Sequence, residues 1–201
     1  MKIIVATNNP GKIKEYNSIL RSFGYEAISL NDAGIESDPE ETGNSYSENA
    51  LIKAKAASEK TDLDVIADDS GIEIEALSQN GKAFPGILSG RWGVKIGGGD
   101  WHKTRLTVLD MLKGKKNRKA KYVCCICLIE KGSEPKFFFG ECEGRILDSE
   151  EGDNGFAYDP IFRSDERSLS FGICPKEIKN EVSHRGKAIR ELSIFLQKGG
   201  K

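Results

Sequence analysis

The 201-residue sequence has no run of about 18 apolar residues, the length that suggests a membrane-spanning helix. Its first ten residues, MKIIVATNNP, contain too short an apolar run for a secretory signal. An excess of one charge is also lacking, since 30 basic residues stand against 31 acidic ones and the formal net charge is −1. This balance gives no general electrostatic attraction for nucleic acid. We therefore expect a cytoplasmic protein that binds neither a membrane nor nucleic acid.

Cysteine and histidine are scarce, with five and two residues. An odd number of cysteines without a secretory signal favours reduced thiols. Cys124, Cys125 and Cys127 form the segment CCIC inside the strand-like run KYVCCICLIE. No second Cys or His pair at metal-ligand spacing accompanies them. Buried, inert thiols are therefore favoured over a metal site.

The sequence also lacks a long internal repeat, a low-complexity segment and a clear Pro/Gly linker. We therefore interpret residues 1–201 as one domain. Its β-branched apolar run predicts a strand over Lys2–Ala6. A helix from about Pro10 to Phe23 follows, because Asn9 can cap its start and Gly24 suits its end.

Further elements follow from the same periodicities. Helices are expected over residues 45–60, from Asp100 onward with Leu106, Leu109 and Leu112 inward, and from Ser183 through residue 198. Strands are expected over Asp64–Ala67, residues 72–77, Ala120–Glu130 and Lys136–Glu143, with a turn at DDSG between the first two. This mixture predicts an α/β (mixed α+β) fold with a mixed sheet, in which ligand sites tend to lie at strand ends.

The segment TNNPGK lies at the start of the first predicted helix. Backbone N–H groups and the helix dipole favour an anion there, and a lysine adds a charge suited to phosphate. The spacing is not that of a Walker A loop. The alternative is a capped helix start with a solvated lysine. The candidate residues are Thr7, Asn8, Asn9, Pro10, Gly11 and Lys12.

Two adjacent acids, Asp68 and Asp69, follow a short apolar run in the segment VIADDSG. Buried unpaired carboxylates are costly, and a divalent cation such as Mg²⁺ would relieve their repulsion. The two side chains point in different directions if the strand pleat continues. The alternative is a turn in which Asp and Ser cap backbone groups. A second acidic segment, DPEETG, reads on its own as an acidic loop before a helix.

The segments GFAYDP and KNEVSHRGKA carry the remaining candidates. Phe156 and Tyr158 can form a stacking wall for a base, or they can be core residues. His184 and Arg185 lie at a predicted helix start, where cations oppose the helix dipole. This placement suits the binding of an anion or a carbonyl, and the alternative is a solvated polar cap.

Taken together, the segments TNNPGK, EETG, SENALIKA, ADDSG, PGILSGRW, GFAYDP and KNEVSHRGKA resemble the inosine/xanthosine triphosphate pyrophosphatase family. The resemblance runs from about Lys2 to Leu196. It implies an elongated, two-lobed mixed α/β fold with a cleft between the lobes, usually as a homodimer. It also implies house-cleaning hydrolysis of deaminated purine nucleoside triphosphates (ITP, dITP and XTP) to nucleoside monophosphate and pyrophosphate. The expected cofactor is Mg²⁺, with Mn²⁺ as an alternative.

The resemblance also implies roles for individual residues. Asp69 matches the metal-associated catalytic acid that accepts a proton from the attacking water, and Glu40 matches a second metal-binding acid. Thr7 through Lys12 match the phosphate loop, and Lys53 and Ser70 match substrate contacts. The base and sugar side is matched by Phe156, Ala157, Tyr158, Asp159, Lys179, His184 and Arg185.

The sequence departs from the family pattern at a few positions. Ala157 stands where glycine is usual, and alanine would hamper a backbone that needs a positive φ. Leu88 and Trp92 stand where tyrosine is common, and Asn8 stands where glycine is more usual. Two alternatives follow: a nucleotide pyrophosphatase of other base specificity, as in the Maf-like group, or a nucleotide-binding protein without turnover.

Overall fold

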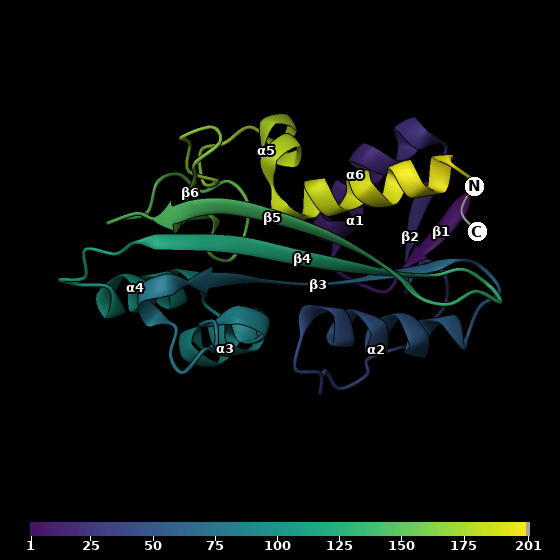
Figure 1. The fold of residues 1–201 in the computed structure, drawn as a ribbon, viewed down its shortest axis with the longest axis horizontal. Coiled ribbons are helices and arrows are strands. Elements are labelled where there is room, and N and C mark those ends of the chain that lie inside the picture. The colour runs from purple at the N-terminus through teal and green to yellow at the C-terminus, as the bar shows by residue number, and fades with distance from the viewer. Residues whose placement is uncertain (200–201) are drawn as a thin grey trace. The chain divides into compact units, whose positions relative to one another are not determined.

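The structure, a computed structural model, describes residues 1–199 (Figure 1). Its strands within these residues form a sheet in the order β2–β1–β3–β4–β5–β6. They are β1 (Lys2–Val5), β2 (Glu26–Ser29), β3 (Val65–Ile74), β4 (Lys119–Ile129), β5 (Lys136–Ile146) and β6 (Phe162–Ser164). β1 pairs in parallel with β2 and β3, whereas β5 and β6 are antiparallel. The predicted mixed sheet in a mixed α/β fold is thus confirmed.

The helices begin where the sequence supplies capping side chains. Asn9 and Asp100 each accept hydrogen bonds from two amides of the first turn, and Ser45 accepts one from Glu48. The α-helices are α1 (Pro10–Leu20), α2 (Tyr46–Ser58), α3 (Ser89–Gly97), α4 (Trp101–Met111), α5 (Lys176–Val182) and α6 (His184–Gln197). Short 3₁₀ turns lie at Arg21–Phe23, Glu75–Leu77, Gly86–Leu88 and Asp159–Ile161.

The predicted turn at DDSG is wrong, because β3 runs without a break through Asp68 and Asp69. Both carboxylates are buried in the strand, where they have cationic or amide partners. Gly71 likewise lies within strand β3 and not in a turn. A Cβ at this position would lie 2.1 Å from the carbonyl oxygen of Gly86, so glycine is needed for the close approach of two backbones.

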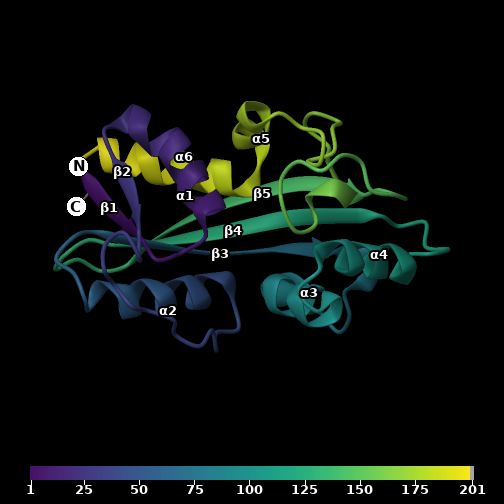
Figure 2. The same cartoon turned by 180° about the vertical axis from the view of Figure 1, so that it is seen from behind.

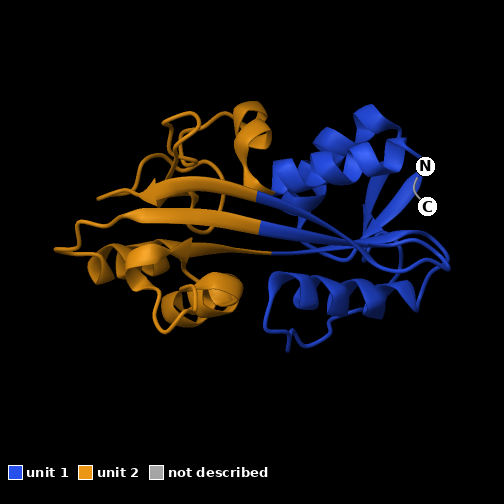
Figure 3. Cartoon of the chain, in the orientation of Figure 1, with its two compact units in different colours: residues 1–69, 124–140, 185–201 blue, residues 70–123, 141–184 orange. Residues whose placement is uncertain are grey.

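The chain divides into two compact units, shown in blue and orange in Figure 3. Unit 1 comprises residues 1–69, 124–140 and 185–201, and unit 2 comprises residues 70–123 and 141–184. Strands β3, β4 and β5 contribute residues to both units. The prediction of one domain with a cleft between two lobes stays a prediction.

In unit 1, helices cover both faces of the strands. Helices α1 and α6 lie on one face and α2 on the other, as Figures 1 and 2 show from opposite sides. Ile66 of β3 packs with Tyr16 of α1 and Leu192 of α6. The next residue of the strand, Ala67, packs with Ala50 and Ala54 of α2. Because side chains alternate between the two faces of a strand, successive residues of β3 pack against different helices.

In unit 2, aromatic residues form much of the core. Tyr122 of β4 contacts the rings of Phe162 and Phe171, and Val108 of α4 and Leu112 at its C-cap belong to the same buried cluster. The five cysteines lie within the described residues, are buried and form no disulfide, which confirms the prediction of reduced, buried cysteine. Among residues 1–199, no helix is long and apolar enough to cross a membrane.

Candidate functional site

Asp68 and Asp69 serve different networks because neighbouring strand residues point to opposite faces. Asp68 lies on the face of Ile66, where its partners come from α1 and α6. Asp69 lies on the face of Ala67, where its partners come from α2. The doubled carboxylate therefore does not place two like charges in one pocket, as the pleat of a continuous strand predicts.

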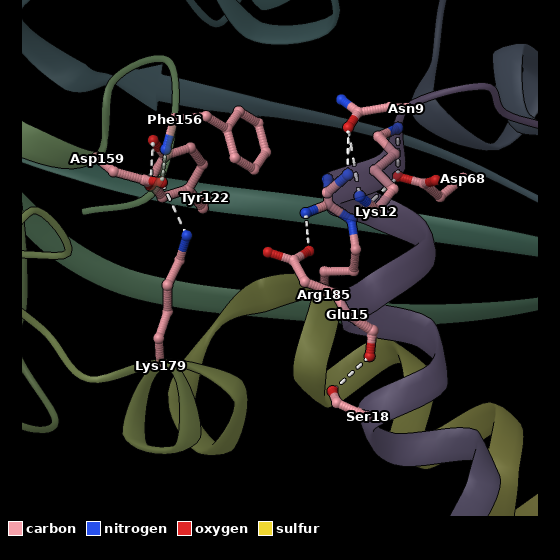
Figure 4. Close-up of polar contacts among 11 residues, drawn as sticks. Asn9, Lys12, Glu15, Ser18, Asp68, Tyr122, Phe156, Asp159, Lys179 and Arg185 are labelled. Atoms are coloured by element: carbon pink, nitrogen blue, oxygen red, sulfur yellow. Dashed lines mark hydrogen bonds and ion pairs between the residues drawn. The ribbon is translucent and has the colours of Figure 1, made fainter. Parts of the chain in front are cut away.

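Asp68 is the centre of a buried ion-pair network in unit 1, drawn in Figure 4. Its carboxylate accepts hydrogen bonds from Lys12 Nζ at 2.9 Å and Arg185 Nε at 3.3 Å. Arg185 Nη1 also donates to Glu15 at 2.6 Å. Burial alone would raise the pKa of Asp68, but the charges of Lys12, Arg185 and Lys53 outweigh it and lower the pKa well below its ordinary value. Asp68 is thus a permanently ionised anchor for the two cations.

Asp69 has the opposite character. It accepts a hydrogen bond from Asn49 Nδ2 at 3.1 Å, and Lys53 Nζ lies 3.7 Å from its other oxygen. Burial raises the pKa of Asp69 above its ordinary value, and the Glu41 and Asp68 carboxylates add to this, against the Lys53 ammonium. A carboxyl group with a raised pKa is a better proton acceptor than an ordinary aspartate.

Lys53 marks a place where a cation fits. Its ammonium donates to Glu41 at 2.6 Å and faces Asp69, so it stands between two carboxylates. Burial alone would lower the pKa of Lys53, but Asp69, Asp68 and Glu41 together raise it. Within residues 1–199 no group of three or more His, Cys, Asp or Glu side chains could hold a metal. Two carboxylates still fit Mg²⁺, which usually completes its octahedron with water and substrate phosphate.

The acid beside this lysine is Glu41 and not Glu40, to which the family resemblance points. Glu40 is exposed, and the structure assigns it no polar contact with Asp69 among the described residues. Its metal-binding role stays a prediction, and Glu41 is the acid that the geometry favours.

The predicted phosphate loop is an exposed helix start in unit 1. Asn9 Oδ1 accepts from the amides of Gly11 at 2.8 Å and Lys12 at 3.4 Å, with Pro10 at the first helical position. Thr7 Oγ1 accepts from the Asn9 amide at 3.2 Å, and Asn8 Oδ1 accepts from the Asn31 amide at 3.0 Å. The loop is therefore held by its own side chains, with only Lys12 reaching the Asp68 network.

In unit 2, Asp159 joins the predicted base-side residues. Its carboxylate accepts from Lys179 Nζ at 2.7 Å, from the Phe156 amide at 2.7 Å and from the Tyr122 hydroxyl at 3.3 Å (Figure 4). Lys179 Nζ also lies 5.3 Å from the ring centre of Phe156, which is 43% exposed. An accessible aromatic face beside a cation suits a planar ligand.

His184 stacks flat against Tyr122 in unit 2, with ring centres 4.5 Å apart and planes 7° from parallel. Arg185, the next residue, belongs to unit 1 and pairs with Asp68 and Glu15. The residues predicted for the base and sugar side therefore fall into two groups: His184 stacks on Tyr122, which also donates to Asp159, and Arg185 pairs with Asp68 and Glu15.

Ala157 has a φ of 53°, in the left-handed region. A residue with a Cβ pays roughly 1–2 kcal/mol for this conformation. The usual glycine of the family pattern therefore has a conformational reason, and alanine here needs a compensating contact. Next to it, the Tyr158 hydroxyl donates to the Ser89 carbonyl at 2.8 Å, and its ring meets Trp101 edge to face.

Several residues at these networks were not assigned by the sequence analysis. Asn49 could have been found, because it lies four residues before Lys53 and so on the same helix face. The partnership of Glu15 with Arg185, 170 residues later, has no local signal. The same holds for Tyr122 with Asp159 and for Arg105 with Ala157. Ser70, predicted to contact substrate, follows Asp69 in β3 and is half-buried.

The fold and these networks define a class of protein: a mixed α/β chain with buried acid–lysine clusters suited to a cation and an anionic ligand. The chain belongs to the Ham1 family, whose profile matches residues 3–195. It is 42% identical over 197 residues to a dITP/XTP pyrophosphatase of Haemophilus influenzae, covering 97% of this chain and 98% of that protein. A dITP/XTP pyrophosphatase of Leptospira interrogans is also 42% identical, over 200 residues, covering 98% and 97%.

Solved structures agree with this assignment. The Staphylococcus aureus Ham1 protein superposes with a TM-score of 0.85 at 36% identity and covers 100% of both chains. A HAM1 protein from Coxiella burnetii also gives a TM-score of 0.85, at 33% identity, with coverage of 98% and 99%. The resemblance inferred from the sequence segments is thus confirmed over nearly the whole chain.

Proposed function

We propose that this protein is a hydrolase that converts dITP, ITP and XTP to the nucleoside monophosphate and pyrophosphate. The observation that carries the proposal is the position of Lys53 between the carboxylates of Asp69 and Glu41. It occurs in a chain 42% identical to a dITP/XTP pyrophosphatase over nearly its full length. Removal of such nucleotides from the pool is the corresponding cellular role. The substrate is a nucleotide of the cell interior, which supports the cytoplasmic location expected from the sequence.

In this proposal Asp69 accepts the proton of the water that attacks the α-phosphate. Its raised pKa supports this role, because a carboxylate at its ordinary pKa holds a proton only weakly. Lys53 is close enough to orient the carboxylate and to meet a phosphate oxygen. Lys12, at the start of α1, adds positive charge where the phosphates would lie.

We propose Mg²⁺ as the cofactor, with Mn²⁺ as an alternative, held by Asp69 and by Glu41 or Glu40. A bound divalent cation would lower the pKa of a coordinated water and offset phosphate charge. Replacement of the metal-holding acid by glutamine should raise the Mg²⁺ concentration needed for half-maximal turnover. A larger shift in Glu41→Gln than in Glu40→Gln would assign the role to Glu41, and the reverse result would restore the assignment to Glu40.

Base selectivity belongs to the unit 2 residues in this proposal. Hypoxanthine and xanthine carry a 6-oxo group, which accepts hydrogen bonds, whereas adenine carries a 6-amino group. Lys179 can only donate, and a protonated His184 also only donates. Donors that meet an amino group stay unpaired, and such mismatches are worth several powers of ten in selectivity.

The proposal is tested by turnover of ITP, dITP, XTP, GTP, ATP, dTTP and UTP, each with Mg²⁺. The expected result is efficient hydrolysis of the first three and little of the others. Preferred hydrolysis of dTTP or UTP would instead place the protein with pyrophosphatases of other base specificity. Tight binding of ITP without any turnover would make it a nucleotide-binding protein. Light scattering after size-exclusion chromatography would test the homodimer that the family resemblance implies.

A further inference from the structure

The loop Gly155–Asp159 is held from one side by Asp159. The Asp159 carboxylate accepts from the Phe156 amide at 2.7 Å, and a Cβ at Gly155 would lie 2.2 Å from the same carboxylate. These contacts fix the start of the loop. They do not reach the carbonyl of Ala157. The left-handed backbone of this residue is unfavourable for any side chain with a Cβ.

Arg105, from α4, holds the loop from the other side. Its Nη1 donates to the Ala157 carbonyl at 3.0 Å. Its other two nitrogens donate to the Glu150 carboxylate, Nε to Oε1 at 2.8 Å and Nη2 to Oε2 at 3.4 Å. A bidentate pair fixes the plane of a guanidinium group and so aims the third nitrogen. The Arg105 side chain is only 14% exposed, and it therefore acts where water competes little.

The bidentate pair of Arg105 with Glu150, called the clamp below, has a further contact from His102. His102 Nδ1 lies 2.9 Å from the same Glu150 oxygen that accepts from Arg105 Nε. Burial alone would raise the pKa of Glu150, but its contacts with Arg105 and His102 outweigh it and lower the pKa. Glu150 is therefore ionised at neutral pH and binds Arg105 as a carboxylate. Each of these residues lies in unit 2.

We propose that Arg105 is a positioning residue that keeps Ala157 in its left-handed conformation, so that base selectivity in this chain depends on it. The alanine at this position lacks the conformational freedom of glycine, and the Arg105 hydrogen bond supplies the restraint that the backbone needs. In this proposal Arg105 acts through the backbone of the loop, to which it donates its hydrogen bond. The kinetic part of this inference rests on the proposed function, whereas the conformational part does not.

A double-mutant cycle tests the proposal with the full-length protein. Wild type, Arg105→Met, Ala157→Gly and the double variant are compared by hydrogen exchange of residues 154–161 and by kcat and KM for ITP and ATP. Lys103→Met is the matched control, because it removes one positive charge from the exposed side of the same helix. Met keeps the length of the arginine stem and removes every donor.

We expect Arg105→Met to speed exchange in residues 154–161 and to lower kcat/KM for ITP by roughly tenfold to a hundredfold, mostly through KM, while Lys103→Met matches wild type. The preference for ITP over ATP should narrow. Ala157→Gly should recover most of the loss in the double variant, because glycine adopts the left-handed conformation without help. A merely structural arginine would give no such rescue.

Wild-type exchange and kinetics in Arg105→Met would overturn the proposal, as would a double variant no better than Arg105→Met. If Arg105→Met does not fold, Glu150→Gln loosens the same clamp and should move exchange and KM in the same direction to a smaller extent, and an unchanged Glu150→Gln would count against the proposal. If wild type does not hydrolyse ITP, the proposed function fails, and the exchange comparison still decides whether Arg105 holds the loop.

Discussion

At the scale of single residues, the neighbouring carboxylates of Asp68 and Asp69 have different partners. The strand pleat sends the carboxylates to different helices. Burial raises the pKa of Asp69, whereas for Asp68 the charges of Lys12, Arg185 and Lys53 outweigh burial and lower the pKa. A pair of acids with separated pKa values is a recurring sign of acid–base chemistry. Asp68 is therefore interpreted as a structural anion and Asp69 as the reactive one.

Asp69→Asn removes the proposed proton acceptor while keeping the shape of the side chain. Turnover of ITP should fall by about 10²–10⁴-fold, the usual contribution of general base catalysis. Stability should stay equal or rise, because a buried carboxylate with a raised pKa destabilises the folded protein at neutral pH. Steady-state kinetics with a thermal unfolding curve checks both. Wild-type turnover in this variant would remove Asp69 from its role.

Asp68→Asn should instead destabilise the protein. It leaves the buried charges of Lys12 and Arg185 without their carboxylate, a change that costs about 3–5 kcal/mol for a buried pair. The Asp68 pKa is lower in the folded than in the unfolded chain, so its contribution is complete above the unfolded value of about 3.9 and is lost as pH falls below it. The difference from wild type should therefore shrink in acid.

Urea unfolding of the metal-free protein at several pH values measures this difference. The exposed pair Asp62–Lys131 provides the control, since Asp62→Asn should leave stability unchanged. A difference between Asp68→Asn and wild type that grows as the pH falls would contradict the assigned role of Asp68.

At the scale of elements, those with strong local signals are predictable from the sequence. The capped helix α1, the alanine-rich helix α2 and the long strands β4 and β5 lie close to their predicted bounds. The continuity of β3 was missed, because Asp, Ser and Gly favour turns locally and their buried partners come from distant segments. Helix α3 was also missed, since its glycines conceal a helix that packing selects.

The inward face of α4 was predicted only in part. Leu106 was expected inward and is 49% exposed, so this prediction is wrong, whereas Leu112 is buried as expected. Val108 fills the buried position one turn before Leu112. Three leucines three residues apart drift around a helix of 3.6 residues per turn, and the i, i+4 spacing of Val108 and Leu112 fits the core better.

The junction between β3 and α3 depends on one buried hydroxyl. Ser89 Oγ accepts from the Ile72 amide at 2.9 Å and contacts the Gly86 carbonyl at 2.6 Å. Ser89→Ala leaves the buried Ile72 amide without this acceptor and should lower the free energy of unfolding by about 1–3 kcal/mol. Chemical denaturation measures the free energy of unfolding. Ser149→Ala, at an exposed position, is the control. Equal stability of the two variants would show that the hydroxyl contributes nothing.

At the scale of the whole molecule, the fold class and family were predictable, because seven short segments in a fixed order span nearly the whole chain. The networks within the site were less predictable. Glu15 and Arg185 are 170 residues apart, and Arg105 and Ala157 are 52 residues apart. Such pairs arise from the packing of distant segments and leave no periodic pattern in the sequence. The sequence therefore points to individual residues of these networks but not to how they are paired.

The central claim concerns the bond that is cleaved, and product analysis tests it most directly. The purified protein is incubated with Mg²⁺ and ITP, and the products are separated by chromatography. The proposed mechanism predicts IMP and pyrophosphate in equal amounts, with the reaction stopped by a chelator and restored by added Mg²⁺. Inosine diphosphate with free phosphate would show that the terminal phosphoanhydride is cut instead, and would contradict the proposed reaction.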